Sequence, residues 1–168
     1  IPCFNEASTV VQTTESALAL DYPADKLEVI LVNDGSKDTT GEVMDTHFSD
    51  NPRVRIIHQE NGGKHTALNA GIAATRAEIV GCLDADSFLR PDALHKTLSC
   101  FENPRTVAAF SSISIHEPRT LLERLQSAEY LIGSFYRHVL ASLNAFFVTP
   151  GPFSIYRREV LVRLGGFR

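Results

Sequence analysis

The sequence of 168 residues lacks several features that mark whole classes of protein. Its three cysteines, Cys3, Cys82 and Cys100, lie far apart and are too few for a disulfide framework, so we expect reduced thiols in the cytosol. No CxxC pair or close His and Cys set suggests zinc. No apolar run approaches the roughly 20 residues of a membrane span, and no signal-peptide pattern is present. The formal charge of -4, without clustered Lys and Arg, argues against nucleic-acid binding.

Two common nucleotide-binding motifs are missing as well. No GxGxxG follows an apolar run, which disfavours dinucleotide binding, and the GxxxxGK[ST] spacing of a Walker loop is absent. The chain is 43% hydrophobic, which is typical of one domain with a sizeable core. It opens on "IPCFNEA" and stops on "LGGFR", so both ends look cut. We therefore expect one domain, truncated at both ends, from a longer protein.

Short apolar runs alternate with segments of helical period. The runs predict strands at Glu28–Asn33, Val54–Gln59, Glu78–Asp84 and Val107–Ile115. Helices are predicted between and around them, at Ser8–Leu20, Lys37–Phe48, His65–Thr75 and Pro91–Phe101. This alternation indicates an α/β fold with a mainly parallel sheet flanked by helices. In such sheets ligands bind beyond the carboxyl ends of the strands, so we expect the functional residues in the turns that follow these strands.

The last part of the chain follows a different pattern. Residues Thr120–Leu143 predict a long amphipathic helix, whose apolar stripe is more often core than membrane face. Residues Phe146–Gly166 predict a Pro/Gly turn, a short strand and a helix that ends at a glycine pair. We interpret Arg157 and Arg158 as the solvated start of that helix.

Two acids end the predicted strand Glu78–Asp84. In an extended segment Asp84 and Asp86 point to the same side, while Ala85 turns away. Neighbouring carboxylates repel each other unless a proton or cation lies between them. Mg²⁺ or Mn²⁺ suits such oxygen ligands, with phosphates completing the shell. A lone DxD is more often a pair of loop acids, one of them capping the helix near Pro91, but its position at the ligand edge favours a metal site.

Two further polar turns, "VNDGSKD" and "NGGKHTALNAG", fall on the same predicted edge. Simple turn and N-cap chemistry explains the first, and the functional interpretation is that Asp34 accepts a hydrogen bond from a base N–H. In the second, Gly62 and Gly63 allow backbone to approach a ligand closely, and Lys64 supplies a mobile charge for phosphate. The alternative for the second turn is a loop with a solvated lysine.

Four motifs, in order and spacing, resemble the family 2 glycosyltransferases: "IPCFNEA", "VILVNDGSKDTT", "NGGKHTALNAGI" and "GCLDADSFLRPDAL". These are inverting enzymes of the Rossmann-like GT-A fold that use nucleotide sugars, and the resemblance covers nearly the whole chain. "QSAEYLIG" and "TPGPFSIYRREVL" are similar to the processive, membrane-bound branch that makes cellulose, chitin, hyaluronan and poly-N-acetylglucosamine. In that branch the segment similar to Thr120–Leu143 lies close to the bilayer, so the alternative to a core position is that Phe135, Tyr136 and Phe147 face the membrane. The resemblance implies a single catalytic domain over 1–168, with a nucleotide-sugar-binding part at 1–115 and the start of the acceptor-side part at 116–168.

The resemblance also implies a site for a UDP-sugar donor with Mg²⁺ or Mn²⁺. Asp34, with Glu6 nearby, contacts the uridine, and Lys64 lies near the nucleotide. The two acids of the DxD serve nucleotide, sugar and metal. The full implied donor site is Pro2, Glu6, Asp34, Lys64, Asp84, Ala85 and Asp86, with Asp86 and Asp84 as metal ligands.

The implied activity is transfer of a hexosyl or N-acetylhexosaminyl group from UDP to a saccharide or other hydroxyl acceptor, as in polysaccharide synthesis. The base that takes the acceptor proton is implied just beyond the "GGF" stretch, past Arg168. We therefore expect residues 1–168 to bind UDP with a metal ion but to transfer sugar slowly or not at all. Segments outside the chain are expected to hold the whole protein at the cytoplasmic face of a membrane, whereas this fragment is expected to be soluble.

Two rival interpretations were weighed. Phosphohydrolases of the haloacid dehalogenase type also carry a strand-end DxD, but they place it after the first strand, whereas here it follows the fourth apolar run counted from Ile1. The stronger rival is a nucleotide-sugar-binding module that has lost transfer. The sequence beyond Arg168 separates that module from a working synthase.

Overall fold

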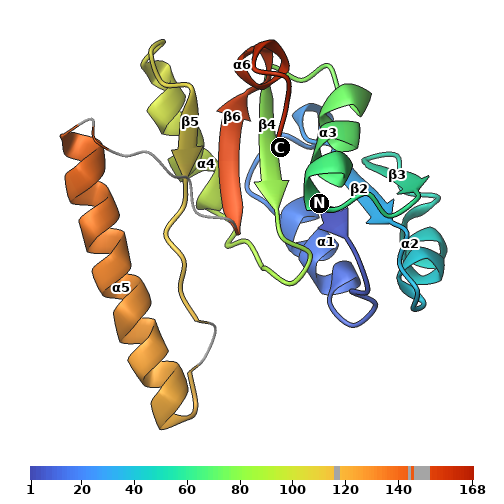
Figure 1. Ribbon diagram of the computed structural model, residues 1–168, viewed down its shortest axis with the longest axis horizontal. Helices are drawn as coiled ribbons and strands as arrows, with labels where there is room; N and C mark the ends of the chain where they lie inside the picture. Colours follow the sequence, from blue (N-terminus) through green and yellow to red (C-terminus); the bar gives the residue numbers. More distant parts are fainter. Residues whose placement is uncertain (116–117, 144, 146–151) are drawn as a thin grey trace.

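The computed structural model describes residues 1–115, 118–143, 145 and 152–168. In this part of the chain the strands form two three-stranded sheets (Figure 1). The strands are β1 (Pro2–Cys3), β2 (Val29–Asp34), β3 (Val54–Gln59), β4 (Ile79–Leu83), β5 (Ala108–Phe110) and β6 (Phe153–Arg157). The helices are α1 (Val10–Leu18), α2 (Thr40–Phe48), α3 (Lys64–Ala74), α4 (Ala93–Leu98), α5 (Leu121–Ser142) and α6 (Arg158–Arg163), with 3-10 turns η1 (Ala24–Lys26) and η2 (Ser99–Glu102).

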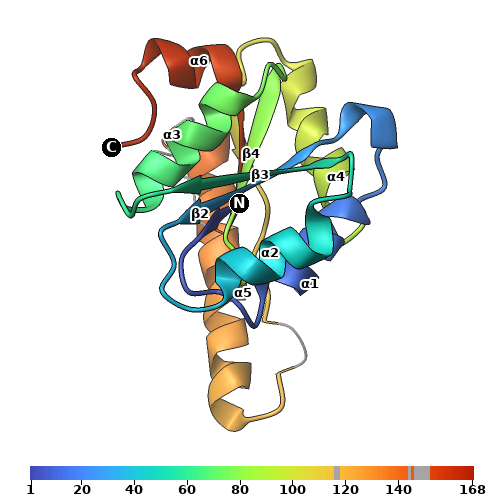
Figure 2. The same ribbon diagram turned by 90° about the vertical axis from the view of Figure 1, so that its right-hand side faces the viewer.

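The first sheet is parallel, in the order β1-β2-β3. Val29 pairs with Val54 and Asp34 with Gln59, so β2 and β3 end together at one edge. The central strand β2 is mostly buried, because α3 lies on one side of this sheet and α1 and α2 lie on the other (Figure 2). The predicted α/β fold, with a parallel sheet flanked by helices, is confirmed.

The second sheet has the order β4-β6-β5 and is antiparallel. Strand β6 therefore lies between two strands that precede it in the chain. The predicted strand Val107–Ile115 is shorter in the structure, where β5 covers Ala108–Phe110. Its partner β6 begins at Phe153, and the Ser111 N–H donates to the Phe153 carbonyl at the end of this pairing. Phe147 and the Pro/Gly turn predicted around Thr149 lie outside the described residues.

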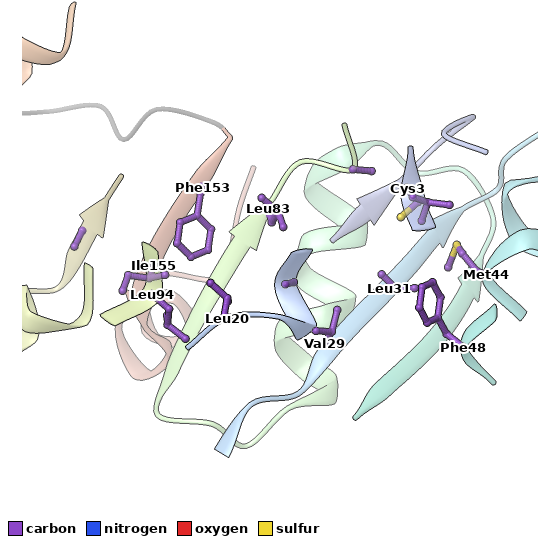
Figure 3. Close-up of a cluster of buried hydrophobic side chains, with 14 residues drawn as sticks. Cys3, Leu20, Val29, Leu31, Met44, Phe48, Leu83, Leu94, Phe153 and Ile155 are labelled. Carbon is purple, nitrogen blue, oxygen red and sulfur yellow. The ribbon is translucent and has the colours of Figure 1, made fainter. Parts of the chain in front are cut away.

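One hydrophobic core runs beneath both sheets (Figure 3). Leu31 of β2 and Ile155 of β6, one in each sheet, are among its fully buried large side chains. Side chains of both sheets thus share this cluster, although no ladder joins the sheets among the described strands. The labelled members of this core are Cys3, Leu20, Val29, Leu31, Met44, Phe48, Leu83, Leu94, Phe153 and Ile155. Ile72, Val80 and Leu161 form a second, smaller cluster.

Helix α5 stands to one side of the sheets (Figures 1 and 2). A capping box between Thr120 and Glu123 fixes its start, as the predicted boundary requires. Its apolar side chains, however, are largely exposed, whereas Ser134 is buried. The prediction that its stripe packs in the core is therefore wrong, because periodicity predicts which side chains share a face but not what that face meets. None of the described helices combines the length and hydropathy that crossing a bilayer requires.

Arg157 was predicted to be solvated, and this is wrong. Its guanidinium donates to the backbone carbonyls of Thr106 (3.0 Å) and Phe101 (3.1 Å) and pairs with Glu78 (3.1 Å). It also lies over the Phe101 ring, 5.3 Å from the centroid. Arg158 likewise donates to a backbone carbonyl of α3. Both arginines thus fasten β6 and α6 to neighbouring elements.

Candidate functional site

Asp34 ends β2 with 2% of its surface exposed, and its carboxylate accepts three hydrogen bonds. The Gln59 amide (2.7 Å) and the Gly62 N–H (3.0 Å) donate to Oδ1, and the Gly63 N–H (2.9 Å) donates to Oδ2. Burial by itself raises the pKa of Asp34, but these hydrogen bonds, with a contribution from Thr66, outweigh it and hold the pKa below its ordinary value. The turn after β3 is therefore anchored on an ionised Asp34.

The turn after β2 lies directly against the turn after β3. Gly35 has a φ of +67°, in the left-handed region, and a Cβ at this position would lie 2.6 Å from the Asn61 backbone nitrogen. The Asn61 side-chain amide in turn donates to the Asp34 backbone carbonyl at 2.9 Å. The glycine of "NDG" is therefore required both by its own backbone and by the neighbouring loop.

The turn after β1 is tied to the same region. The Asn5 side chain accepts a hydrogen bond from the Lys37 N–H at 2.8 Å, and the Glu6 N–H donates to the Thr40 hydroxyl at 2.8 Å. The Glu6 carboxylate accepts a hydrogen bond from the Thr9 hydroxyl at 2.9 Å. The structure thus brings Glu6 beside the turn that follows Asp34, where the sequence predicted it.

Lys64 joins the loop at Gly62–Gly63 to the acids after β4. It is the first residue of α3, and its Nζ lies 2.5 Å from Asp84 Oδ1. The lysine side chain is 57% exposed and the aspartate side chain 27% exposed, so the pair contributes about 1 kcal/mol or less and can exchange for a better partner. The loop at Gly62–Gly63 thus contacts Asp34 on one side and, through Lys64, Asp84 on the other. We refer to this region as the acidic corner and define it as Asp34, Gly62, Gly63, Lys64, Asp84 and Asp86.

The DxD lies in a turn and not in the extended segment that the sequence predicted, because β4 ends at Leu83 and the Ser87 N–H donates to the Asp84 carbonyl at 3.1 Å. Ala85 is buried, while Asp86 is exposed and Asp84 is half-buried. The Ser87 hydroxyl donates to Asp86 Oδ1 at 3.3 Å. The Lys64 ammonium already relieves part of the repulsion that the sequence predicted between the two acids.

The donor set of the acidic corner fits a hard divalent cation. Within the described ranges no group of three or more His, Cys, Asp or Glu side chains is placed to hold a metal ion, so Asp84 and Asp86 would supply at most two carboxylates. Mg²⁺ and Mn²⁺ tolerate this, because they keep several waters and take phosphate oxygens as further ligands. The protein would therefore hold the ion together with a phosphorylated ligand.

The buried thiols do not compete for such an ion. Burial raises the pKa of Cys3 to about 11 and that of Cys82 to about 11, so both thiols are protonated at neutral pH. Metal ligation and nucleophilic attack both require the thiolate.

Of the remaining predicted residues, Pro2 lies in β1 opposite Val32 of β2. The roles of all seven residues in donor binding stay predictions. Gln59 was missed, although the equal lengths of the two apolar runs could have placed it beside Asp34. Asn69 was also missed: its side-chain amide donates to the Phe167 carbonyl (2.9 Å) and accepts from the Phe167 N–H (2.8 Å), and no local signal in the sequence indicates this.

The large cavity of the molecule does not coincide with the acidic corner. It has a volume of about 1190 Å³ and is lined by residues of β2, α3 and β4, among others. Its lining includes Val29, Ile30, Ile79 and Val80, and none of the carboxylates of the acidic corner. The charged groups of the predicted site converge at the acidic corner and not in this cavity.

A family model for glycosyl transferase family 2 matches residues 1–165. The chain belongs to glycosyl transferase family 2. The predicted resemblance is thereby confirmed, over almost all of the sequence.

The relatives of this family 2 chain include polysaccharide synthases. It is 33% identical over 168 residues to the poly-beta-1,6-N-acetyl-D-glucosamine synthase of Staphylococcus aureus (strain COL), covering 98% of this chain and 40% of the relative. The corresponding synthase of Staphylococcus epidermidis is 34% identical over 169 residues, with the same coverage. The chain thus spans about 40% of the length of these curated relatives.

Solved structures share the fold. The mannosyltransferase PcManGT from Pyrobaculum calidifontis, in complex with GDP-Man and Mn²⁺, has a TM-score of 0.76 and 28% identity, covering 99% of this chain and 46% of that chain. S. aureus TarS 1–349 in complex with UDP-GlcNAc has a TM-score of 0.69 and 18% identity, covering 98% of this chain and 46% of that chain. At 18% identity, the likeness to TarS shows the fold alone.

Proposed function

We propose that the chain forms the donor-binding part of a transferase that adds N-acetylglucosamine from UDP-N-acetylglucosamine to a growing polysaccharide. The observation that carries this proposal is the acidic corner, in which Asp34 holds the loop at Gly62–Gly63 and the next residue, Lys64, contacts Asp84 of the DxD. The similarity to poly-beta-1,6-N-acetyl-D-glucosamine synthases supports the choice of sugar and product.

The uridine end of the donor is assigned to Asp34 and Glu6. Among the described contacts, Asp34 Oδ1 accepts two hydrogen bonds and Oδ2 accepts one, from Gly63. A carboxylate oxygen has two lone pairs, so Oδ2 retains capacity for the uracil N–H. The low pKa of Asp34 suits this role, because the ionised carboxylate is a pure acceptor.

The diphosphate end is assigned to Lys64 and the two acids of the DxD. Lys64 begins α3, and the N-terminus of a helix favours an anion. The exposed pair that Lys64 makes with Asp84 leaves the ammonium able to turn towards phosphate. When Mg²⁺ or Mn²⁺ is bound by Asp84 and Asp86, it neutralises the charge of the departing diphosphate. Ala85, the residue between the two acids, is buried.

The division of labour along the chain is part of the proposal. Residues 1–115 carry the donor site, together with Pro2 at the start of β1, and residues 116–168 begin the acceptor side. The hydroxyl of a saccharide acceptor attacks the sugar in line with the departing diphosphate. The whole protein acts at the cytoplasmic face of a membrane, through segments outside these residues.

A second donor, GDP-mannose, has a specific observation in its favour. The mannosyltransferase at 28% identity was solved with GDP-Man and Mn²⁺. Guanine and uracil differ in size and in their pattern of donors, so the base is the feature that separates the two candidates.

Calorimetry with UDP and with GDP, each in Mn²⁺ and in EDTA, tests the proposal. We expect UDP to bind more tightly than GDP, and Mn²⁺ to strengthen its binding. Asp86→Asn should abolish this metal enhancement, whereas the exposed Asp50→Asn, in the turn after α2, should preserve it. Tighter binding of GDP would favour the second candidate, and binding of neither nucleotide would contradict both.

Transfer itself is tested in the natural protein that contains these residues. Incorporation of labelled N-acetylglucosamine from its UDP donor into polymer, lost in Asp86→Asn, is the expected result. Metal-dependent UDP binding without incorporation would instead favour the non-catalytic nucleotide-sugar-binding module.

A further inference from the structure

The turn that carries the two acids has little regular structure of its own. Between the end of β4 and the start of α4, its internal backbone hydrogen bond runs from the Ser87 N–H to the Asp84 carbonyl, at 3.1 Å. A turn held this lightly does not by itself fix the separation of two carboxylates. The contacts that hold it from outside therefore matter for any ligand that both acids bind together. Two kinds of contact reach Asp84 itself: its N–H donates to the Pro152 carbonyl at 3.1 Å, and its carboxylate pairs with Lys64.

Helix α1 supplies two further contacts, through hydroxyl groups, to the residues that follow. The Thr13 hydroxyl donates to the Ala85 carbonyl at 2.8 Å, and the Ser16 hydroxyl accepts from the Leu89 N–H at 3.1 Å. Thr13 and Ser16 are three residues apart and so lie on one face of the helix. Together they hold both ends of the segment that contains Asp86.

The Thr13 contact is buried and long-range. Thr13 is 0% exposed, and its acceptor Ala85, which is also buried, lies 72 residues further along the chain. The carbonyl belongs to the residue between the two acids, so this hydrogen bond fixes the peptide that sets their relative position. The Ser16 hydroxyl also donates to the Thr13 carbonyl at 2.7 Å, which keeps it aligned with its neighbour.

Thr14, which follows Thr13 in α1, can be compared with it. Thr14 is also 0% exposed, and its hydroxyl donates to a backbone carbonyl, that of Val10, at 2.7 Å. That contact stays within α1. Two adjacent threonines therefore have the same chemistry and burial, but one of them reaches the DxD turn.

We propose that Thr13, assisted by Ser16, is a positioning residue that sets the geometry of Asp84 and Asp86 for a divalent cation bound with a nucleoside diphosphate. The proposal rests on the proposed function, because it assigns the acids to a metal ion. Mg²⁺ demands near-ideal coordination distances, so a small displacement of the turn weakens the site without removing a ligand. Partners that orient metal ligands typically change metal affinity by about 10- to 100-fold when they are lost.

The test measures UDP affinity of the 168-residue chain in saturating Mn²⁺ and in EDTA, and takes the ratio as the metal enhancement. Thr13→Val, which removes the hydroxyl and keeps the shape, should reduce this ratio about tenfold while the affinity in EDTA is unchanged. Thr13→Ser, which keeps the hydroxyl, should retain the ratio. Thr14→Val is the matched control and should also retain it.

A wild-type ratio in Thr13→Val would overturn the proposal, and so would an equal loss in Thr14→Val. If Thr13→Val does not fold, Ser16→Ala decides the matter: the proposal expects a smaller loss of metal enhancement, and an unchanged ratio would refute it. Failure of the proposed function is seen separately, because wild-type protein would then show no metal-enhanced UDP binding at all.

Discussion

The acidic corner is held by contacts between distant parts of the chain, whereas helix α5 is held by contacts within the helix. In the acidic corner, polar groups from residues far apart in the chain satisfy one another, as Asp34 does with the loop at Gly62 and Gly63. In α5, the capping box and the helix's own hydrogen bonds define the element, while large apolar side chains stay exposed. The geometry of the acidic corner therefore depends on the whole fold, whereas that of α5 depends on contacts within the helix. The apolar side chains of α5 remain exposed.

The largest expected change in unfolding free energy is at Leu31, and Leu131 of α5 is its matched comparison. Leu31 is 0% exposed at the centre of the core, whereas Leu131 of α5 is 73% exposed. Leu31→Ala should lower the free energy of unfolding by about 3 kcal/mol, because it removes buried methyl groups and leaves a cavity. Leu131→Ala should change it by about 0.5 kcal/mol or less. Urea unfolding gives both values, and a large loss in Leu131→Ala would mean that α5 is buried in solution.

A pair of glycines tests whether close contacts fix the corner. Gly35 and Gly165 both have positive φ, so alanine is strained at either position by about 1 kcal/mol. A Cβ at Gly35 would also meet the Asn61 backbone, whereas one at Gly165 would meet nothing within 4 Å. Gly35→Ala should therefore cost about 2 kcal/mol or more, and Gly165→Ala only the strain. Equal losses in urea unfolding would argue against a tight contact between the two turns.

The pH dependence of the unfolding free energy should change by a smaller amount, and only for Asp34, the acid of the acidic corner. The folded-state pKa of Asp34 is lowered, so its charge stabilises the fold above the ordinary pKa of about 3.9, and this contribution is lost as the pH falls through the lowered value. The unfolding free energy of Asp34→Asn should therefore depend less steeply on pH below about 5 than that of the wild type.

The matched acid in α5 is Glu123, whose pKa is lowered by the N–H groups of Thr120 and then of Arg119. These contacts are local to the start of α5, so Glu123→Gln should leave the pH dependence of global unfolding nearly unchanged. If both variants flatten the curve equally, the corner is no more firmly held than the start of α5.

The smallest effect concerns the helix cap. Thr120→Ala removes the hydroxyl that accepts the Glu123 N–H at 3.2 Å, which should weaken the start of α5 by about 1 kcal/mol. Amide hydrogen exchange in the first turn should become faster, while the urea midpoint and UDP affinity stay at their wild-type values. Thr120→Ser is the control. A shift of UDP affinity would show that the two regions are coupled.

Much of the first sheet could be predicted from the sequence. The strand Val54–Gln59 has its predicted bounds, because an apolar run between polar turns leaves little freedom in placing it. The meeting of Asp34, Lys64 and Asp84 also followed from the rule that ligands bind beyond the carboxyl ends of strands.

Other features depend on contacts that no local pattern reveals. The insertion of β6 between β4 and β5 pairs residues far apart, such as Leu83 with Phe153. The hydrogen bond from Thr13 to Ala85 starts in the middle of a helix, where a threonine gives no signal. The exposure of α5 depends on what surrounds it and not on its period.

The position of β6 has a consequence for how the chain is made. Among the described strands, β4 pairs only with β6, so all of residues 84–152 must be synthesised before its partner exists. At the usual speed of a ribosome this takes on the order of 3 to 14 seconds. Throughout that delay the strand leading to Asp84 presents an unpaired edge, which is a point of vulnerability to misassembly. The nascent protein therefore acquires its acidic turn late, and a ribosome that stalls before Phe153 releases a chain whose edge has never been closed.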